Sequence, residues 1–333
     1  MESPPPKVAA GDEIVKKITE FLGPELEEVD RLLRESLRAE SDLIDEVGDY
    51  LNLTRGKKLR PMLTLLMCRA MNPGARPPVE VAASIELIHV ATLIHDDVID
   101  KATLRRGQPS VNARWGDDVA ILMADFLYAR AFDLALASLE PQVMRLLCKV
   151  TQKMCEGEML QIKLRAEDYA PEQYFDIVER KTGSLFSACT ALGCLLGGGA
   201  PVDVGGARAF GNQFGIAFQV TDDILDFLAP EGKWGKELGM DAADGKQTLP
   251  ILLAMAEASP ADRLRMRRWS RNGRDVAEIV RLLRRYRGLD RALDEARRFA
   301  GRAAEALAGV ACADEASAER LAMLPRYVIE RTY

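Results

Sequence analysis

Histidine is scarce in this chain, with only His89 and His95 among 333 residues. Neither position supports a Ser-His-Asp or Cys-His triad, and no G-x-x-x-x-G-K-S/T phosphate loop is present. A di-iron site in a helical bundle needs two Glu-x-x-His units. Glu86 and His89 form one such unit, but Thr92 stands three residues before His95. The sequence therefore excludes these kinds of site.

Other absences narrow the class of protein further. The six cysteines include no C-x-x-C pair and fall inside predicted helices, so we interpret them as reduced core residues. A net charge of -6 excludes a general nucleic-acid surface. The first residues have neither a basic start nor an apolar stretch, so we expect a cytoplasmic protein. Segment 184–202 is uncharged but rich in glycine, which indicates a buried helix rather than a transmembrane span.

Helical periodicity dominates what is present. Leu26, Val29 and Leu33 show the spacing of three or four residues that marks the buried face of a helix. No alternating pattern typical of strands stands out. Segment 81–94 is apolar on nearly all sides, so we expect a central helix there, ended by Asp96. Because the helical pattern continues from end to end, we predict one large all-α domain over residues 1–333.

The motif Asp-Asp-x-x-Asp occurs twice, at Asp96–Asp100 and at Asp222–Asp226, and each copy closes an apolar run. Carboxylates in an apolar setting are costly unless cations or basic partners neutralise them. In a helix, the first and last Asp of each motif lie four residues apart on one face. Mg2+ is usually held by a few carboxylates together with water and substrate phosphate. The two motifs therefore predict bound Mg2+ and a polyanionic substrate.

Basic residues accompany both acidic motifs. One cluster precedes Pro61 at a helix start, where backbone N–H groups and cations can meet a phosphate. A pair of arginines follows the first motif, and Arg binds phosphate in bidentate fashion. His89 precedes Asp96 by about 10.5 Å along one helical face, within reach of a second anion. The cations concerned are Lys57, Lys58, Arg60, Arg105, Arg106, Lys236 and Lys246.

Taken together, these residues resemble the trans-type isoprenyl diphosphate synthases. The resemblance implies a bundle of helices around a deep central cavity, usually in a homodimer. It covers about residues 55–253 and consists of ordered matches at Gly56-Lys57-Lys58-Leu59-Arg60-Pro61, His95-Asp96-Asp97-Val98-Ile99-Asp100, Arg105-Arg106-Gly107, Gly157-Glu158-Met159-Leu160-Gln161, Lys181-Thr182-Gly183, Gln219-Val220-Thr221-Asp222-Asp223-Ile224-Leu225-Asp226 and Gly235-Lys236.

The resemblance also implies a role for each matching residue. The metal ligands would be Asp96, Asp97, Asp100, Asp222 and Asp226, with Asp223 beside them. The allylic diphosphate would contact Arg105, Lys181, Lys236 and Lys246. Isopentenyl diphosphate would bind Lys57, Arg60, His89 and Arg106, while Thr182 and Gln219 would line the reacting carbons. Ionising an allylic diphosphate needs stabilised leaving-group charge more than a protein nucleophile, so the lack of a catalytic histidine is consistent with this chemistry.

Product length depends, in the resembling family, on the residues four and five places before the first Asp. A bulky aromatic there closes the tunnel, whereas this chain has Thr92 and Ala91. Ile88 and Met123 would then help form the tunnel floor. We therefore predict a long product, about eight to ten isoprene units for a quinone side chain. A geranylgeranyl synthase is the nearest alternative; a class I terpene cyclase and a non-catalytic synthase subunit are others.

Overall fold

The computed structural model describes residues 10–51, 56–105, 107–164, 169–228, 247–272 and 276–331. The element order begins with α1 (Ala10–Phe21), α2 (Gly23–Ser36), α3 (Asp42–Leu51), α4 (Leu59–Met71), α5 (Val79–Ile99), β1 (Leu104–Arg105), β2 (Gln108–Pro109), α6 (Val111–Trp115), α7 (Asp117–Leu136) and α8 (Pro141–Leu164). It continues with α9 (Pro171–Val178), the π-helical turn η1 (Glu179–Gly183), α10 (Ser184–Leu196), α11 (Pro201–Leu225), α13 (Leu249–Glu257), α14 (Pro260–Asn272), α15 (Val276–Arg285), α16 (Gly288–Ala308) and α17 (Glu315–Glu330). The predicted all-α fold is confirmed.

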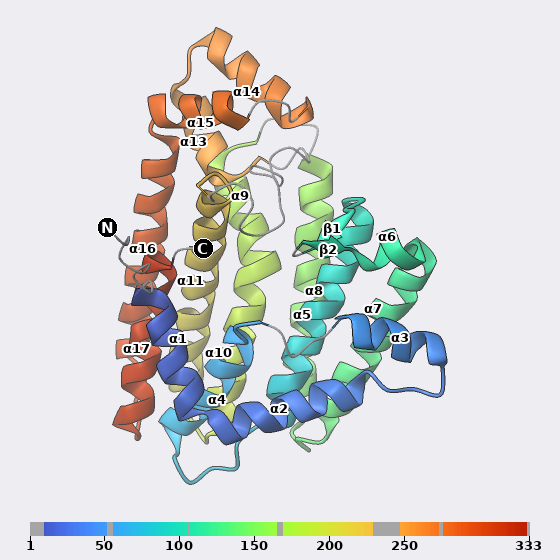
Figure 1. Cartoon of the computed structure of the whole chain (residues 1–333). Helices are drawn as coiled ribbons and strands as arrows, with labels where there is room; N and C mark the ends of the chain where they lie inside the picture. The colour runs from blue at the N-terminus through green and yellow to red at the C-terminus, as the bar shows by residue number, and fades with distance from the viewer. Residues whose placement is uncertain are drawn as a thin grey trace, which may run out of the picture.

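Long helices α5, α8, α10, α11 and α16 run roughly alongside one another, and α2 crosses one end of the bundle (Figure 1). At the opposite end lie α14 and α15. One cluster of buried residues extends from Ile14 to Val328, so helices from both ends of the described chain share a core. The β1–β2 hairpin, in which Leu104 pairs with Pro109, follows α5. None of the described helices is long and apolar enough to cross a membrane.

Helix α5 differs from its prediction at the end that matters for function. We expected Asp96 to end this helix, but it continues to Ile99, and Asp100 is its C-cap. Helix α11 ends in the same way, with Asp226 as its C-cap. Asp96–Asp100 and Asp222–Asp226 therefore occupy the last turns of two long helices. The apolar segment 184–202 contains the buried helix α10, which ends at Leu196 with Gly197 as its C-cap, where the glycines predicted the end.

The six cysteines are not equally buried, and Cys312, between α16 and α17, is half-buried and outside any helix, contrary to the prediction. All six are free thiols, and Cys68, Cys189 and Cys194 are buried as predicted. Burial raises the pKa of Cys68 to about 11 and that of Cys189 to about 12, so these thiols stay protonated at neutral pH. The prediction was wrong for Cys148 and Cys155, which are exposed on α8. A helix with one buried stripe exposes residues that lie off that stripe.

Candidate active site

The two aspartate motifs line one cavity of about 890 Å³. Asp96 and Asp100 come to its wall from α5, and Asp222 and Asp226 from α11. The carboxyl end of a helix carries partial negative charge, which makes additional carboxylates there unfavourable. Two such helix ends facing one cavity create a strongly negative region. The arrangement favours bound cations.

The donor set fits Mg2+ shared with a substrate. Within the described residues, no group of three or more His, Cys, Asp or Glu side chains could hold a metal ion by itself. Mg2+, however, is commonly bound through one or two carboxylates and completed by water and substrate phosphates. Each motif offers one such pair of hard oxygen donors four residues apart on a helix. The site thus matches a metal that arrives with a diphosphate.

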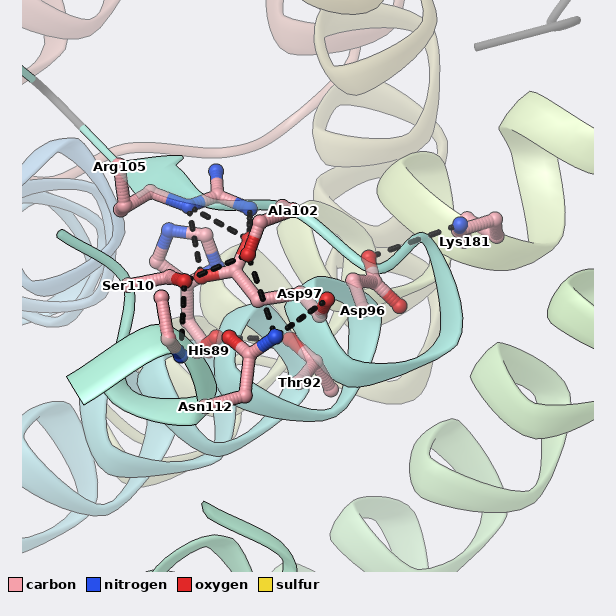
Figure 2. A network of polar contacts seen from close by, with 10 residues as sticks. His89, Thr92, Asp96, Asp97, Ala102, Arg105, Ser110, Asn112 and Lys181 are labelled. Atoms are coloured by element: carbon pink, nitrogen blue, oxygen red, sulfur yellow. Dashed lines mark hydrogen bonds and ion pairs between the residues drawn. The ribbon is translucent and has the colours of Figure 1, made fainter. Parts of the chain in front are cut away.

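Asp97 in the first motif is held by protein contacts. Its side chain is buried, and the Nε atom of Arg105 donates to both carboxylate oxygens at 3.0 and 3.1 Å. A second guanidinium nitrogen also contacts Asp97. The Asn112 amide donates to the Ala102 carbonyl at 3.1 Å and to the Asp97 carbonyl at 3.4 Å, which secures the turn after α5 (Figure 2). Asp97 therefore fixes Arg105 at the cavity wall.

Asp223 in the second motif is held in a corresponding way. It is 4% exposed, and it accepts hydrogen bonds from the Tyr174 hydroxyl at 2.6 Å and from Gln219 Nε2 at 2.9 Å. Thr182 Oγ1 in turn donates to Gln219 Oε1 at 3.0 Å. Burial, followed by the nearby Asp223 charge, raises the pKa of Tyr174 well above its ordinary value, so the hydroxyl remains a donor. This chain of contacts orders Thr182 and Gln219 beside the motif.

Lys181 reaches across the cavity to the first motif. Its Nζ atom lies 3.6 Å from Asp96 Oδ2. Figure 2 draws this ion pair. Lys181 also contacts Glu158 and Gln161 on α8. Lys181 belongs to the π-helical turn η1, a kind of turn that is frequent at functional sites. A Cβ atom on Gly157 would lie 2.9 Å from Lys181 Cγ, so glycine allows α8 to approach this turn closely. Two helices and η1 thus position one cation.

A second group of basic residues lines the same cavity. It includes Lys57, Arg60 and His89. Lys57 Nζ lies 2.8 Å from Asp12 and 5.6 Å from the centre of the Tyr327 ring. Burial alone would lower the pKa of Lys57, but these two neighbours outweigh it and raise the pKa, so Lys57 stays charged. Arg60 stacks at 4.5 Å over the Phe186 ring.

Two sets of predicted residues are not among the lining residues described above. Arg106, Lys236 and Lys246 fall outside the described residues. Of the four predicted chain-length residues, all described, only Thr92 lines the cavity. Its hydroxyl donates to the His89 carbonyl at 2.7 Å. The other three are buried in the helix packing, with exposed fractions of 0% for Ile88 and Ala91 and 3% for Met123.

Sequence reasoning assigned no role to several residues that the structure brings to the site. Tyr174 and Arg331 line the cavity, and Asp12 reaches Lys57 from α1. Glu158 lies in a matched motif, and its position after Gly157 was the available signal. Tyr174 lies 49 residues from its partner Asp223, and nothing in its local sequence distinguishes it from a core tyrosine.

Comparison with known proteins identifies the class to which this fold and site belong. Residues 41–285 match the model of the family described as polyprenyl synthetase. The chain belongs to this family, and it is a prenyltransferase of the trans-isoprenyl diphosphate synthase type. The predicted resemblance is therefore confirmed.

Individual relatives agree on the family and differ in product. The chain is 34% identical to a short chain isoprenyl diphosphate synthase of Methanothermobacter thermautotrophicus, over 95% of this chain and 99% of the relative. It is 35% identical to the octaprenyl diphosphate synthase of Escherichia coli, over 80% of this chain and 83% of the relative. A polyprenyl synthase from Caulobacter crescentus, solved with calcium and isoprenyl diphosphate, is similar with a TM-score of 0.90 and 30% identity; the match covers 99% of this chain and all of that one.

Proposed function

We propose that the protein condenses an allylic diphosphate with isopentenyl diphosphate and repeats the step to make a long all-trans polyprenyl diphosphate. The observation that carries this proposal is the shared cavity, whose lining includes both aspartate motifs and the basic residues Lys57, Arg60 and His89. One substrate diphosphate would lie between the motifs, and the other at the cations. A class I terpene cyclase has no use for the second diphosphate site, and a non-catalytic subunit has no use for two intact motifs.

All six motif aspartates line the cavity. Asp96, Asp100, Asp222 and Asp226 would hold Mg2+ ions, because Asp97 and Asp223 are each only 4% exposed. Bound Mg2+ would neutralise the charge that develops on the leaving diphosphate. Binding of metal by Asp97 stays a prediction. Its contacts support a positioning role, because it holds Arg105 where the guanidinium can meet the allylic diphosphate.

Lys181 would bind the same diphosphate from the opposite wall. Its present neighbours Asp96 and Glu158 hold it close to the first motif. Thr182 and Gln219, tied together and to Asp223, would line the reacting carbons with fixed dipoles. Fixed dipoles and cations that need not reorganise can stabilise developing charge efficiently. Contacts of Lys236 and Lys246 with this diphosphate remain predictions.

Lys57, Arg60 and His89 would bind isopentenyl diphosphate, and Arg106 is predicted to join them. The alkene of this substrate attacks the allylic carbon as the carbon–oxygen bond to diphosphate breaks. The resulting carbocation loses a proton to form the new double bond. The released diphosphate is a suitable acceptor for that proton, so no protein base is required.

The relatives differ in product length. We therefore propose the product length of this protein from the residues near its first aspartate motif. Thr92 is a small side chain on the cavity wall one helical turn before Asp96. Without an aromatic ring there, the growing chain can extend between the helices, which supports products of about forty to fifty carbons. We propose that such a product serves as a quinone side chain. A geranylgeranyl synthase remains the alternative.

We further propose that the enzyme is a homodimer. Large apolar side chains are exposed along α7, α8 and the loop between them, with exposed fractions of 68% for Leu122, 58% for Leu136, 90% for Leu139 and 72% for Met159. Large apolar side chains exposed on two helices that pack together favour a protein interface. A second copy of the chain would cover it. The cytoplasmic location stays a prediction from the sequence.

Incorporation of labelled isopentenyl diphosphate tests the catalytic proposal. We expect incorporation to need both an allylic diphosphate and a divalent ion. Asp96→Asn and Asp222→Asn should each lower the rate by about 10²- to 10³-fold, since each removes a carboxylate that would hold Mg2+ at the reacting diphosphate. The matched control is Asp290→Asn, whose side chain is 69% exposed on α16 beside Arg287. Equal rates in all three variants would contradict the proposal.

A further inference from the structure

Arg331, immediately after α17, inserts its side chain into the second aspartate motif. The side chain is only 8% exposed, and its Nη2 atom lies 2.7 Å from Asp222 Oδ1. The same nitrogen donates to the Phe218 carbonyl at 2.6 Å, and the guanidinium carbon lies 3.8 Å from the centre of the Phe218 ring. Arg331 and Asp222 both line the cavity.

The environment of this guanidinium indicates that Asp222 is its main electrostatic partner. A guanidinium has five N–H donors, and within the described residues the buried Nε of Arg331 has no hydrogen-bond partner. A buried charge is costly unless an opposite charge compensates it. The carboxylate that would receive a metal ion therefore already carries a cation supplied by the chain.

We propose that Arg331 is a built-in counter-cation of the second aspartate motif, which a divalent ion must displace from Asp222 in order to bind there. This inference rests on the proposed function. Before metal binds, the guanidinium offsets the repulsion among the carboxylates at the end of α11. A metal ion and the guanidinium would compete for one carboxylate, and two adjacent cations repel each other.

The contacts of Arg331 also connect the motif to the first helix. A Cβ atom on Gly11 would lie 3.1 Å from Arg331 Cα, so α1 packs directly against this residue. The next residue along α1, Asp12, pairs with Lys57 at 2.8 Å. If Arg331 leaves the motif, it therefore moves beside α1, the helix that also contacts Lys57 at the proposed isopentenyl diphosphate site.

Titration with Mn2+ in the absence of any substrate, followed by the electron paramagnetic resonance signal of the free ion, tests this inference. The main variant is Arg331→Met, which keeps an apolar stem over Phe218 and removes the charge; Arg331→Lys is the matched control. We expect the methionine variant to bind Mn2+ about two- to fivefold more tightly, as expected for loss of one partly exposed ion pair. The lysine variant should stay close to the parent.

The role of Asp222 is isolated by repeating the titration in an Asp222→Asn background. There the methionine substitution should leave Mn2+ affinity unchanged. An unchanged or weaker affinity in the single variant, or an equal gain without Asp222, would overturn the inference. Thermal unfolding of each variant confirms that the comparison is between folded proteins. Because no turnover is measured, failure of this test is distinct from failure of the proposed catalytic activity.

Discussion

Replacing Tyr174 with Phe tests how the second aspartate motif is held. Tyr174 is 5% exposed, Asp223 is 4% exposed, and the hydroxyl lies 2.6 Å from the carboxylate. Phenylalanine keeps the packing of the ring but removes the donor. A hydrogen bond to a charged group contributes about 1.5–3 kcal/mol. Because both partners are buried, water does not weaken this hydrogen bond by screening. We therefore expect the free energy of unfolding to fall by about 2 kcal/mol.

Tyr169→Phe is the matched control, because the Tyr169 hydroxyl donates at 2.8 Å to the Gln247 carbonyl, which is neutral. Bonds between neutral groups contribute about 0.5–1.5 kcal/mol. Urea unfolding at one fixed protein concentration measures both variants, since self-association would change the apparent stability. Tyr174→Phe should lose about 1 kcal/mol more than Tyr169→Phe. Equal losses would refute the claim that Tyr174 stabilises a buried charged carboxylate.

Two further predictions concern the tunnel and the pH dependence of stability. Thr92→Phe should shorten the products with little effect on stability. Ala91→Phe, at a fully buried position, should also shorten them and should lower the free energy of unfolding by about 1–3 kcal/mol. Unchanged product lengths in both variants would contradict the tunnel model. Burial raises the pKa of Tyr128, Tyr169 and Tyr174 above the ordinary value of 10. The folded state therefore binds these protons more tightly, and their contribution to stability is complete below pH 10 and is lost as pH rises above it. Urea unfolding at a series of alkaline pH values should show this fall, and a constant free energy there would count against it.

Much of the site could be predicted from the sequence because its chemistry is concentrated in short motifs. The spacing within Asp96–Asp100 and Asp222–Asp226 fixes which carboxylates share a helix face. Apolar periodicity then places both motifs on helices. The structure adds that each motif forms the last turn of its helix. The apolar pattern alone predicted that α5 ends at Asp96, which is too early, because the helix continues through the charged residues to Ile99.

Contacts between distant segments could not be predicted. Arg331 reaches Asp222 across 109 positions, and Tyr174 reaches Asp223 across 49. When its local sequence is considered alone, Tyr174 is an ordinary residue of an amphipathic helix and Arg331 an ordinary residue just after one. Only the packing of α17 and α9 beside α11 gives them their roles. The burial of Ala91 against neighbouring helices, away from the cavity wall, depends on packing in the same way.

Incubation of the purified protein with Mg2+, farnesyl diphosphate and labelled isopentenyl diphosphate, followed by separation of the products by length, tests the central claim most directly. The account predicts a ladder of products that ends at about forty to fifty carbons, as the cavity wall at Thr92 permits. Products that end at about twenty carbons would support the geranylgeranyl alternative and refute the long-chain proposal. No incorporation at all would contradict the proposed condensation itself.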